Sequence, residues 1–360
     1  MKPFSYAVVG TGWRSGVFLK LARLLPGTLR ITSVVSRTAE RGAEVEAEWG
    51  VPTDRTLAAA VARERPDFVV ISVPRTVAPG VAREAVGLGL PVLCETPPAL
   101  DVDGMLSLWS SVGASGLVQV AEQYLLLPGH AARLALIRDG ALGTVSNVQV
   151  SSTHQYHAVS IIRHMLGAGF ADAEVTARRS TFPLADPMHR SGWSDDVTPK
   201  RMGNTLAQFD FGDDRTGLYD FTDNQWHNPL RGSRIVVRGS TGELVDDHLV
   251  QLRDPRTVVE SDLVRRQTGL DMNLEGFDLD HISLGGAVLF RNPWQGARLA
   301  DDEIAVASLL ERTGAWARDG APPPYPLAEA CQDHLLALAV EESLVAGATV
   351  RTARRPWAEG

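Results

Sequence analysis

The sequence predicts an α/β fold in two parts, an N-terminal Rossmann domain with a doubly wound parallel sheet and a C-terminal α+β domain with a large, mostly antiparallel open sheet and helices. Three observations predict it: strand and helix patterns alternate in the first third, glycines follow the first strand, and alternating runs follow one another in the second half. A chain of 360 residues accommodates two domains of ordinary size. We place them at residues 1–122 and 123–360.

In the first third, short runs rich in β-branched residues alternate with amphipathic stretches. The expected strands lie at residues 6–10, 29–36, 67–74, 91–96 and 117–124, and the expected helices at 14–27, 38–50, 77–89 and 101–115. Parallel strands joined by helices are buried on both faces, which is why such strands are almost continuously apolar. The pattern therefore indicates βαβ units.

Beyond residue 123 the rhythm changes. The expected elements are a helix at 128–143, a strand at 144–152, a helix from His157, strands at 204–212 and 216–226, a hairpin at 233–247, and helices at 301–320 and 326–347. Strands that follow each other without a helix between them pair antiparallel. Strict alternation would place Tyr219, Phe221, Asp223 and Gln225 on one face, and Asp220, Thr222, Asn224 and Trp226 on the other.

The sheet over residues 203–250 is expected to form a contact between subunits. One face has the helices of its own domain to cover it, and the other is expected to carry Tyr, Phe and Trp side chains that should not stay in water. We therefore expect a homodimer or a homotetramer. Trp226 and His227 are candidates for lining a pocket.

Composition and charge bear on partners and location. The formal net charge of −8 argues against a nucleic-acid partner, because phosphate binding needs concentrated Lys and Arg. No apolar stretch is long enough for a bilayer, so no membrane partner is expected. Cys94 and Cys331 are too few for a disulfide framework, and residues 1–10 lack a signal-peptide pattern, so we expect a cytoplasmic protein. The Asp- and His-rich stretches lack metal-ligand spacing, so no metal is expected.

The stretch VVGTGWRSGVF places Gly10, Gly12 and Gly16 between the first expected strand and the first expected helix. Gly10 would permit the tight turn, and Gly12 would permit the close approach of a pyrophosphate, which the positive end of the helix favours. Because the turn opens a βαβ unit, we expect it to bind a dinucleotide, with Trp13 and Arg14 beside it.

The end of the second expected strand indicates which dinucleotide binds. An Asp or Glu at this position normally binds the ribose 2′-hydroxyl of NAD. Here Ser36 and Arg37 stand instead, and a hydroxyl and a guanidinium suit a 2′-phosphate. NADP(H) is therefore the preferred cofactor, with NAD(H) as the alternative.

Further motifs follow the glycine turn. The chain carries VISVP at the end of a buried strand, then GLPVLCETPPAL, then VQVAEQYLLLPGHAARLALIRDGALGTV. In order and spacing these motifs resemble the glucose-fructose oxidoreductase, inositol dehydrogenase and MocA (Gfo/Idh/MocA) family of nicotinamide-dependent oxidoreductases, over nearly the whole chain. The resemblance implies cofactor contacts at Val73, Pro74, Glu95, Thr96 and Gln123.

The chain departs from that family at two catalytic positions. Residues 94–97 usually read C-E-K-P there, and the lysine touches both the nicotinamide ribose and the substrate hydroxyl, whereas Thr96 stands here. A second family signature, D-x-x-x-H before an apolar helix, is matched at His157, but Thr153 replaces the aspartate. Two of the three expected catalytic side chains are therefore absent.

The remaining candidates for proton transfer surround His157, which the resemblance places at the start of a helix facing the cofactor. They are His154, Tyr156 and Tyr124. An imidazole with a pKa of about 6.5 can donate or accept a proton near neutrality, whereas a tyrosine with a pKa of about 10 is chiefly a donor.

The leading interpretation is a nicotinamide-dependent oxidoreductase that acts on a carbonyl, imine or hydroxyl carbon of a sugar, glycoside, cyclitol or related secondary metabolite. His157 or a neighbouring tyrosine would supply the proton. One alternative is a redox-elimination enzyme like the family's NAD-dependent glycosidases, which also depart from the lysine pattern and show no net cofactor turnover. The other is a non-catalytic nucleotide-binding regulator. All three rest on the resemblance, because a fold does not fix a function.

Overall fold

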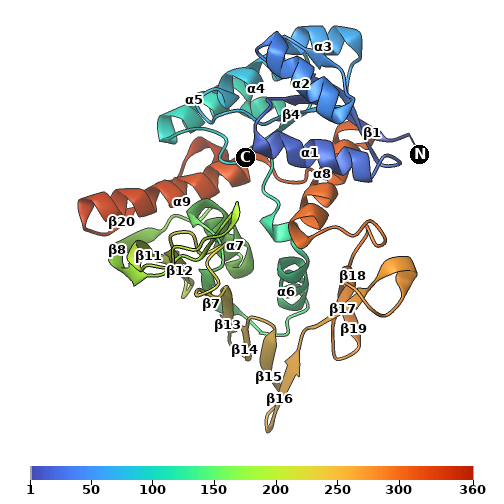
Figure 1. The fold of residues 1–360 in the computed structure, drawn as a ribbon. Helices are drawn as coiled ribbons and strands as arrows, with labels where there is room; N and C mark the ends of the chain where they lie inside the picture. Colours follow the sequence, from blue (N-terminus) through green and yellow to red (C-terminus); the bar gives the residue numbers. More distant parts are fainter. Residues whose placement is uncertain (1, 360) are drawn as a thin grey trace.

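The computed structural model describes residues 2–359, and the two larger sheets have six and nine strands (Figure 1). The first sheet is parallel, in the order β3-β2-β1-β4-β5-β6. Its strands are β1 (Phe4–Val9), β2 (Leu29–Val35), β3 (Thr53–Asp54), β4 (Phe68–Ile71), β5 (Val92–Cys94) and β6 (Val118–Val120). Its helices are α1 (Trp13–Leu24), α2 (Ala39–Trp49), α3 (Leu57–Arg63), α4 (Ala78–Gly87) and α5 (Val102–Val112). The doubly wound Rossmann domain is confirmed, and its strand order reverses between β1 and β4, where ligands bind in such sheets.

The starts of the helices differ in a way that matters for binding. Thr38, Thr56 and Asp101 cap α2, α3 and α5, each accepting a hydrogen bond from the backbone N–H three residues further on. At α1 the capping position is Gly12, and no side chain among residues 2–359 caps this helix. The N–H groups of its first turn are therefore left for a ligand.

The second domain is built on a nine-stranded sheet in the order β16-β15-β14-β13-β7-β12-β11-β8-β20. Every neighbouring pair is antiparallel except β7 and β12. The strands are β7 (Val145–Ser151), β8 (Glu174–Leu184), β11 (Lys200–Asp210), β12 (Thr216–Thr222), β13 (Arg234–Gly239), β14 (Gly242–Val245), β15 (His248–Asp254), β16 (Thr257–Asp262) and β20 (Val350–Arg351). The large, mostly antiparallel sheet is thus confirmed.

Smaller elements complete this domain. A hairpin joins β9 (Met188–His189) and β10 (Gly192–Trp193), and a three-stranded sheet joins β17 (Val264–Thr268), β18 (Asp278–Leu284) and β19 (Ala287–Arg291). The helices are α6 (Pro128–Arg138), α7 (Gln155–Leu166), α8 (Asp301–Asp319) and α9 (Leu327–Ala346). None of the helices within residues 2–359 has the length and apolarity needed to cross a membrane.

The expected alternation over residues 219–226 is correct only as far as Thr222, where β12 ends. Asn224 has a φ of +59°, so the chain turns there instead of continuing as a strand. Tyr219 and Phe221 are buried on the face that α7 covers. The outer face carries Leu206, which is 50% exposed, in place of the expected aromatic side chains. The premise that Tyr and Phe face solvent is therefore wrong.

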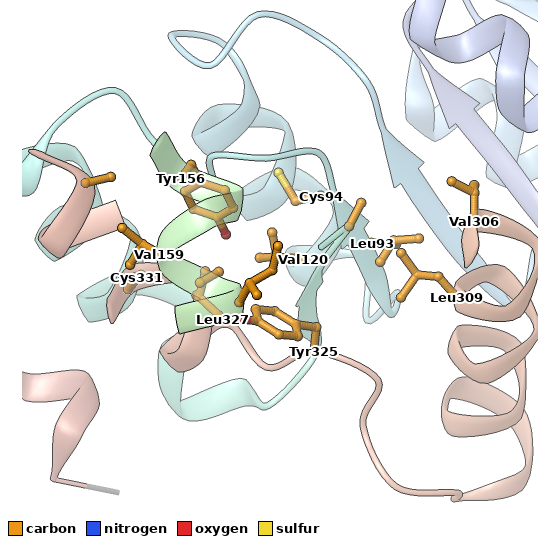
Figure 2. Close-up of a cluster of buried hydrophobic side chains, with 14 of the residues drawn as sticks. Leu93, Cys94, Val120, Tyr156, Val159, Val306, Leu309, Tyr325, Leu327 and Cys331 are labelled. Carbon is orange, nitrogen blue, oxygen red and sulfur yellow. The ribbon is translucent and has the colours of Figure 1, made fainter. Parts of the chain in front are cut away.

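An apolar core joins the two domains. Figure 2 shows Cys94 and Val120, from the ends of β5 and β6, beside Tyr156 of α7 and Cys331 of α9. The backbone N–H of Val120 also donates to the Tyr325 carbonyl at 2.9 Å. Although α8 lies late in the sequence, it packs on β1 and β4 (Figure 1). These contacts fix the relative position of the domains and hence the shape of the cleft between them.

Candidate active site

A cavity of about 1550 Å³ lies where the carboxyl ends of β1, β2, β4 and β5 face the second domain. All the residues expected in the site line it: Gly10, Gly12, Trp13, Arg14, Ser36, Arg37, Val73, Pro74, Glu95, Thr96, Gln123, Tyr124, His154, Tyr156 and His157. Trp226 and His227 line it as well. The structure therefore brings the expected cofactor and catalytic residues together in one space.

The glycine turn has the shape that a dinucleotide requires. Gly10 has a φ of +118°, and a Cβ there would lie 2.1 Å from the carbonyl oxygen of Ser72. Only glycine can therefore hold β1 this close to the segment after β4. A Cβ at Gly12 would meet no atom within 4 Å. The space beside Gly12, in front of the uncapped N-terminus of α1, fits a pyrophosphate.

Basic side chains surround the end of β2. Ser36 is buried, and its hydroxyl donates to the Thr38 carbonyl at 3.1 Å. Arg37 is exposed, and no carboxylate of residues 2–359 lies within ion-pair distance of it. Arg41 donates to the carbonyl of Thr11, another residue of the cavity wall, at 3.1 Å. The Arg37 guanidinium thus lines the cavity at the end of β2, and the Arg41 guanidinium, which is ion-paired with Glu44, lies behind Thr11.

A buried carboxyl–imidazole pair lies on the cavity wall near the end of β6. His157, in the first turn of α7, places Nδ1 2.5 Å from Oε2 of Glu122. Oε1 of Glu122 accepts a hydrogen bond from the Tyr124 backbone N–H at 2.9 Å. The Glu122 side chain is fully buried, and that of His157 is 10% exposed. Because Nδ1 is bonded to Glu122, Nε2 is the ring nitrogen available to a substrate.

Burial sets the protonation of this pair. It raises the pKa of Glu122 to about 8 and lowers the pKa of His157 to about 4. Both shifts favour the uncharged forms, so near pH 7 the pair is a carboxylic acid and a neutral imidazole. The acid then donates to Nδ1, and the ring carries its own proton on Nε2. The pair therefore offers the Nε2–H of His157 to a substrate as a donor, and the Glu122 carboxyl holds a second proton that can move to Nδ1.

Aromatic rings enclose His157. The Tyr124 ring stacks on it with a centroid separation of 4.2 Å, and the His154 ring lies 4.8 Å away. Trp226 stands edge-on to His154 at 4.9 Å. Burial raises the pKa of Tyr124 and lowers that of His154 to about 4, so both are neutral near pH 7. The enclosure limits the water around His157 and offers apolar ring faces to a substrate.

Tyr156 is oriented differently from the other candidates. Its ring lies 5.3 Å from that of His157, but its hydroxyl points into the apolar core between the domains (Figure 2). That hydroxyl is buried without a hydrogen-bond partner among residues 2–359, and burial raises its pKa well above 10. Tyr156 therefore contributes a wall to the site, and its hydroxyl is poorly placed to exchange a proton with a substrate.

A polar network connects the domains on the other side of the cavity. Arg14 Nε donates to Glu95 Oε1 at 2.8 Å, and Arg14 Nη1 lies 3.6 Å from Asp302 of α8. Gln123 Nε2 donates to Asp302 Oδ1 at 3.0 Å. Arg14, Glu95 and Gln123, which are expected cofactor contacts, are thus linked to one another directly or through Asp302. The hydroxyl of Thr96, where the family lysine would stand, has no hydrogen-bond partner within residues 2–359.

Arg190 closes the cavity mouth from the second domain. It lies in the turn between β9 and β10, and its guanidinium carbon is 4.0 Å from the centroid of the Trp13 ring. A cation over an aromatic face is attracted by the ring quadrupole. Trp13 is otherwise exposed, so this contact bridges the two domains over the cofactor region.

Sequence reasoning missed four residues of the site: Glu122, Arg41, Arg190 and Asp302. Glu122 could have been found, because it stands two residues after the buried parallel strand β6, much as Glu95 follows β5. Arg190 and Asp302 gave no such signal, since they reach the cavity from elements distant in the sequence. No cluster of three or more His, Cys, Asp or Glu side chains suited to a metal ion occurs between residues 2 and 359.

A dinucleotide fold whose cleft ends at a buried acid–base pair defines the class of nicotinamide-dependent oxidoreductases. Residues 4–122 match the model GFO_IDH_MocA, described as an oxidoreductase family with an NAD-binding Rossmann fold. The N-terminal domain of the chain belongs to the Gfo/Idh/MocA oxidoreductase family. The resemblance and the expectation of a nicotinamide-dependent oxidoreductase are therefore confirmed.

Solved structures share the fold over nearly the whole chain, whereas no curated protein sequence matches it significantly. An oxidoreductase domain protein from Kribbella flavida is 19% identical, with 98% of this chain and 100% of that chain covered and a TM-score of 0.71. A myo-inositol dehydrogenase from Corynebacterium glutamicum is 16% identical, with 98% and 100% covered and a TM-score of 0.66. Levoglucosan dehydrogenase in complex with NADH and levoglucosan is 16% identical, with 97% and 99% covered and a TM-score of 0.68.

Proposed function

We propose that the protein is an NADP(H)-dependent oxidoreductase that interconverts a hydroxyl and a carbonyl carbon of a sugar, glycoside or cyclitol. The observation that carries this proposal is that one cavity is lined by both the glycine turn and His157, whose Nδ1 is hydrogen-bonded to the buried Glu122 behind it. Hydride transfer requires the cofactor and the reacting carbon to share one enclosed space.

The residues present fit a dinucleotide. The open space at Gly12 and the first turn of α1 would hold the pyrophosphate, and Arg37 and Arg41 would hold a 2′-phosphate. When bound, the nicotinamide supplies the hydride donor or acceptor. NADP(H) is preferred because the Arg37 guanidinium, and no Asp or Glu, lines the cavity at the end of β2.

His157 would handle the proton. In the direction of reduction, Nε2–H would give its proton to the carbonyl oxygen of the substrate, and Nδ1 would take the proton of Glu122. The imidazole therefore stays neutral, and the negative charge lies on the Glu122 carboxylate. In the direction of oxidation the same path runs backwards. Tyr124 holds the ring by stacking, and the free Thr96 hydroxyl would add only a neutral hydrogen bond to ribose or substrate.

A sugar-like substrate is supported by the walls of the cavity and by a relative. Trp226 is 46% exposed and Tyr124 is stacked beside the acid–base pair, and such rings pack against the C–H faces of a sugar. Asn224 and His227 supply polar groups nearby. Levoglucosan dehydrogenase, which shares the fold, is known in complex with NADH and levoglucosan.

The test follows the absorbance of reduced nicotinamide while the enzyme is offered sugars, glycosides and cyclitols with NADP⁺, and the matching ketones with NADPH. We expect net turnover. His157→Ala should lower kcat by about 10²- to 10⁴-fold, the usual value of a positioned acid or base, and leave the Kd for NADPH nearly unchanged. His248→Ala, on exposed β15, is the matched control and should behave as wild type.

Two other outcomes would contradict the proposal. Tight NADPH binding without turnover of any compound indicates a nucleotide-binding regulator. Cleavage of a glycoside without net change in reduced nicotinamide indicates the redox-elimination reaction.

A further inference from the structure

A second cavity, of about 580 Å³, adjoins the candidate active site. It is bounded by α9, by the strands β8, β11 and β12, and by residues 97–100 of the first domain. Its volume lies within the range of about 300–1,000 Å³ that is typical of small-ligand sites. The proposed chemistry at His157 does not use it.

The two cavities share part of their walls. His154, Trp226, Asn224, Arg75 and Pro97 line both of them. His154 touches the His157 ring on one side and the edge of Trp226 on the other. The two cavities are therefore adjacent, on either side of His154 and Trp226.

An ion pair at the far wall is held ready for a polar ligand. Arg179 Nη2 lies 2.6 Å from Asp223 Oδ2, and Arg179 Nη1 donates to Thr205 Oγ1 at 2.9 Å. The Gly203 N–H donates to the same Asp223 oxygen at 3.1 Å, and a Cβ at Gly203 would lie 2.1 Å from Arg179 Nη2. A side chain at residue 203 would therefore displace this pair from its observed position. Asp223 Oδ1 makes no hydrogen bond to residues 2–359, and further Arg179 donors are free.

The charges in this cavity balance. Arg75 and Arg179 are opposed by Asp223 and Glu341, so no net charge selects an anion or a cation. A carboxylate next to a guanidinium offers acceptors and donors to adjacent hydroxyl groups, and the exposed face of Trp226 offers an apolar surface to a ring. This combination suits a neutral, polyhydroxylated ring.

We infer that the second cavity binds a second sugar unit, so that the substrate is a disaccharide or another glycosyl conjugate whose reacting sugar lies at His157. The inference rests on the proposed function and adds to it the size and class of the substrate. The second unit would pack on Trp226 and accept and donate hydrogen bonds at Arg179 and Asp223.

The test compares kcat/KM for each sugar that the enzyme turns over with kcat/KM for that sugar carrying an α- or β-linked glucose. The added unit should raise kcat/KM by about tenfold or more in one linkage, equivalent to about 1.4 kcal/mol. Leu338→Trp fills the second cavity from α9 and should bring the ratio to about one. Val345→Trp, at an exposed position of the same helix, should keep the wild-type ratio.

Arg179→Met provides a second variant in case Leu338→Trp does not fold. Loss of one hydrogen bond to a charged group should lower the ratio by about tenfold. If neither linkage gives a gain, or if the gain survives in Leu338→Trp and Arg179→Met, the second cavity is not a sugar site although the oxidoreductase proposal stands. If no sugar or glycoside exchanges hydride with the cofactor, the proposed function itself fails, and this inference with it.

Discussion

At the scale of single residues, Thr96 and Glu122 have to be considered together, because we expect Glu122 to take over the proton transfer that the lysine at the position of Thr96 performs in the family. A threonine in place of the family lysine removes a cation that would otherwise help a proton off the substrate hydroxyl. The buried Glu122 carboxyl, bonded to His157, can hold a proton near neutral pH because burial raises its pKa to about 8. We expect this carboxyl to replace the lysine as the group that donates or accepts the proton, through His157.

This role predicts a pH dependence. Below the raised pKa of Glu122 the pair holds two protons, and Nε2 of His157 can donate one. Above it the carboxylate accepts a hydrogen bond from Nδ1–H, and Nε2 becomes an acceptor. Reduction should therefore slow about tenfold per pH unit above about pH 8, and oxidation should rise toward the same pH.

Glu122→Gln tests this assignment, because an amide can still hydrogen-bond to Nδ1 but does not titrate. Its pH–rate profile should lack the limb near pH 8. A variant that keeps the wild-type limb would show that another group supplies it.

The location of the site was predictable, and the roles of several residues were not. Strand ends of a parallel sheet meet at one edge, so Gly10, Ser36 and Glu95 could be assigned to one cavity from the sequence. The side of α7 that faces the cavity depends on how the helix packs on β7 and α9. For that reason the inward direction of the Tyr156 hydroxyl could not be read from spacing alone.

At the scale of elements, α7 and α9 are joined by a buried ionic cluster. Arg163 of α7 donates to Asp333 at 2.5 Å and to Glu329 at 2.9 Å, both on α9. Tyr325 donates its hydroxyl to the second oxygen of Asp333 at 2.5 Å. Arg163 and Asp333 are almost completely buried, so the Asp333 carboxylate depends on Arg163 for its counter-charge, and Arg163 is balanced by Asp333 and Glu329 together. The cluster holds the helix that carries His157.

Removing one partner should be costly. Asp333→Ala leaves the buried Arg163 guanidinium with the Glu329 carboxylate alone and removes the acceptor of the Tyr325 hydroxyl, and we expect the free energy of unfolding in urea to fall by about 3–5 kcal/mol. Glu342→Ala, at an exposed position of α9, should change it by no more than about 0.5 kcal/mol. Equal stabilities for the two variants would contradict the importance of the cluster.

The elements that escaped prediction are those without a clear burial pattern. β3, β9 and β10 have two residues each, too few for any periodicity. The strands β17 and β19 are largely exposed, so apolar and polar residues do not alternate along them. The helices α8 and α9, by contrast, bury long apolar faces, and their bounds were close to those expected.

At the scale of the whole molecule, we expect the outer face of the nine-stranded sheet to pair two or four subunits. Its helix side is already covered, but Leu206 and Leu252 of the outer face are 50% and 48% exposed. Sedimentation velocity at micromolar concentration should show a homodimer or a homotetramer, and Leu206→Glu should shift it toward monomer. Leu274→Glu, on an exposed loop, is the control. A wild-type protein that sediments only as a monomer would contradict this expectation.

The two domains matter together because neither one alone contains the site. The first supplies the glycine turn and Glu122, and the second supplies His157, with Asp302 and Arg190 reaching across.

The central claim is that a nicotinamide dinucleotide lies in this shared cavity with its reactive ring beside His157. The most direct measurement is a crystal structure of the protein with NADPH. We predict pyrophosphate at the first turn of α1, the 2′-phosphate in contact with Arg37, and the nicotinamide ring next to His157. A structure in which NADPH does not bind this cavity, or binds it with the nicotinamide out of contact with His157, would contradict the claim.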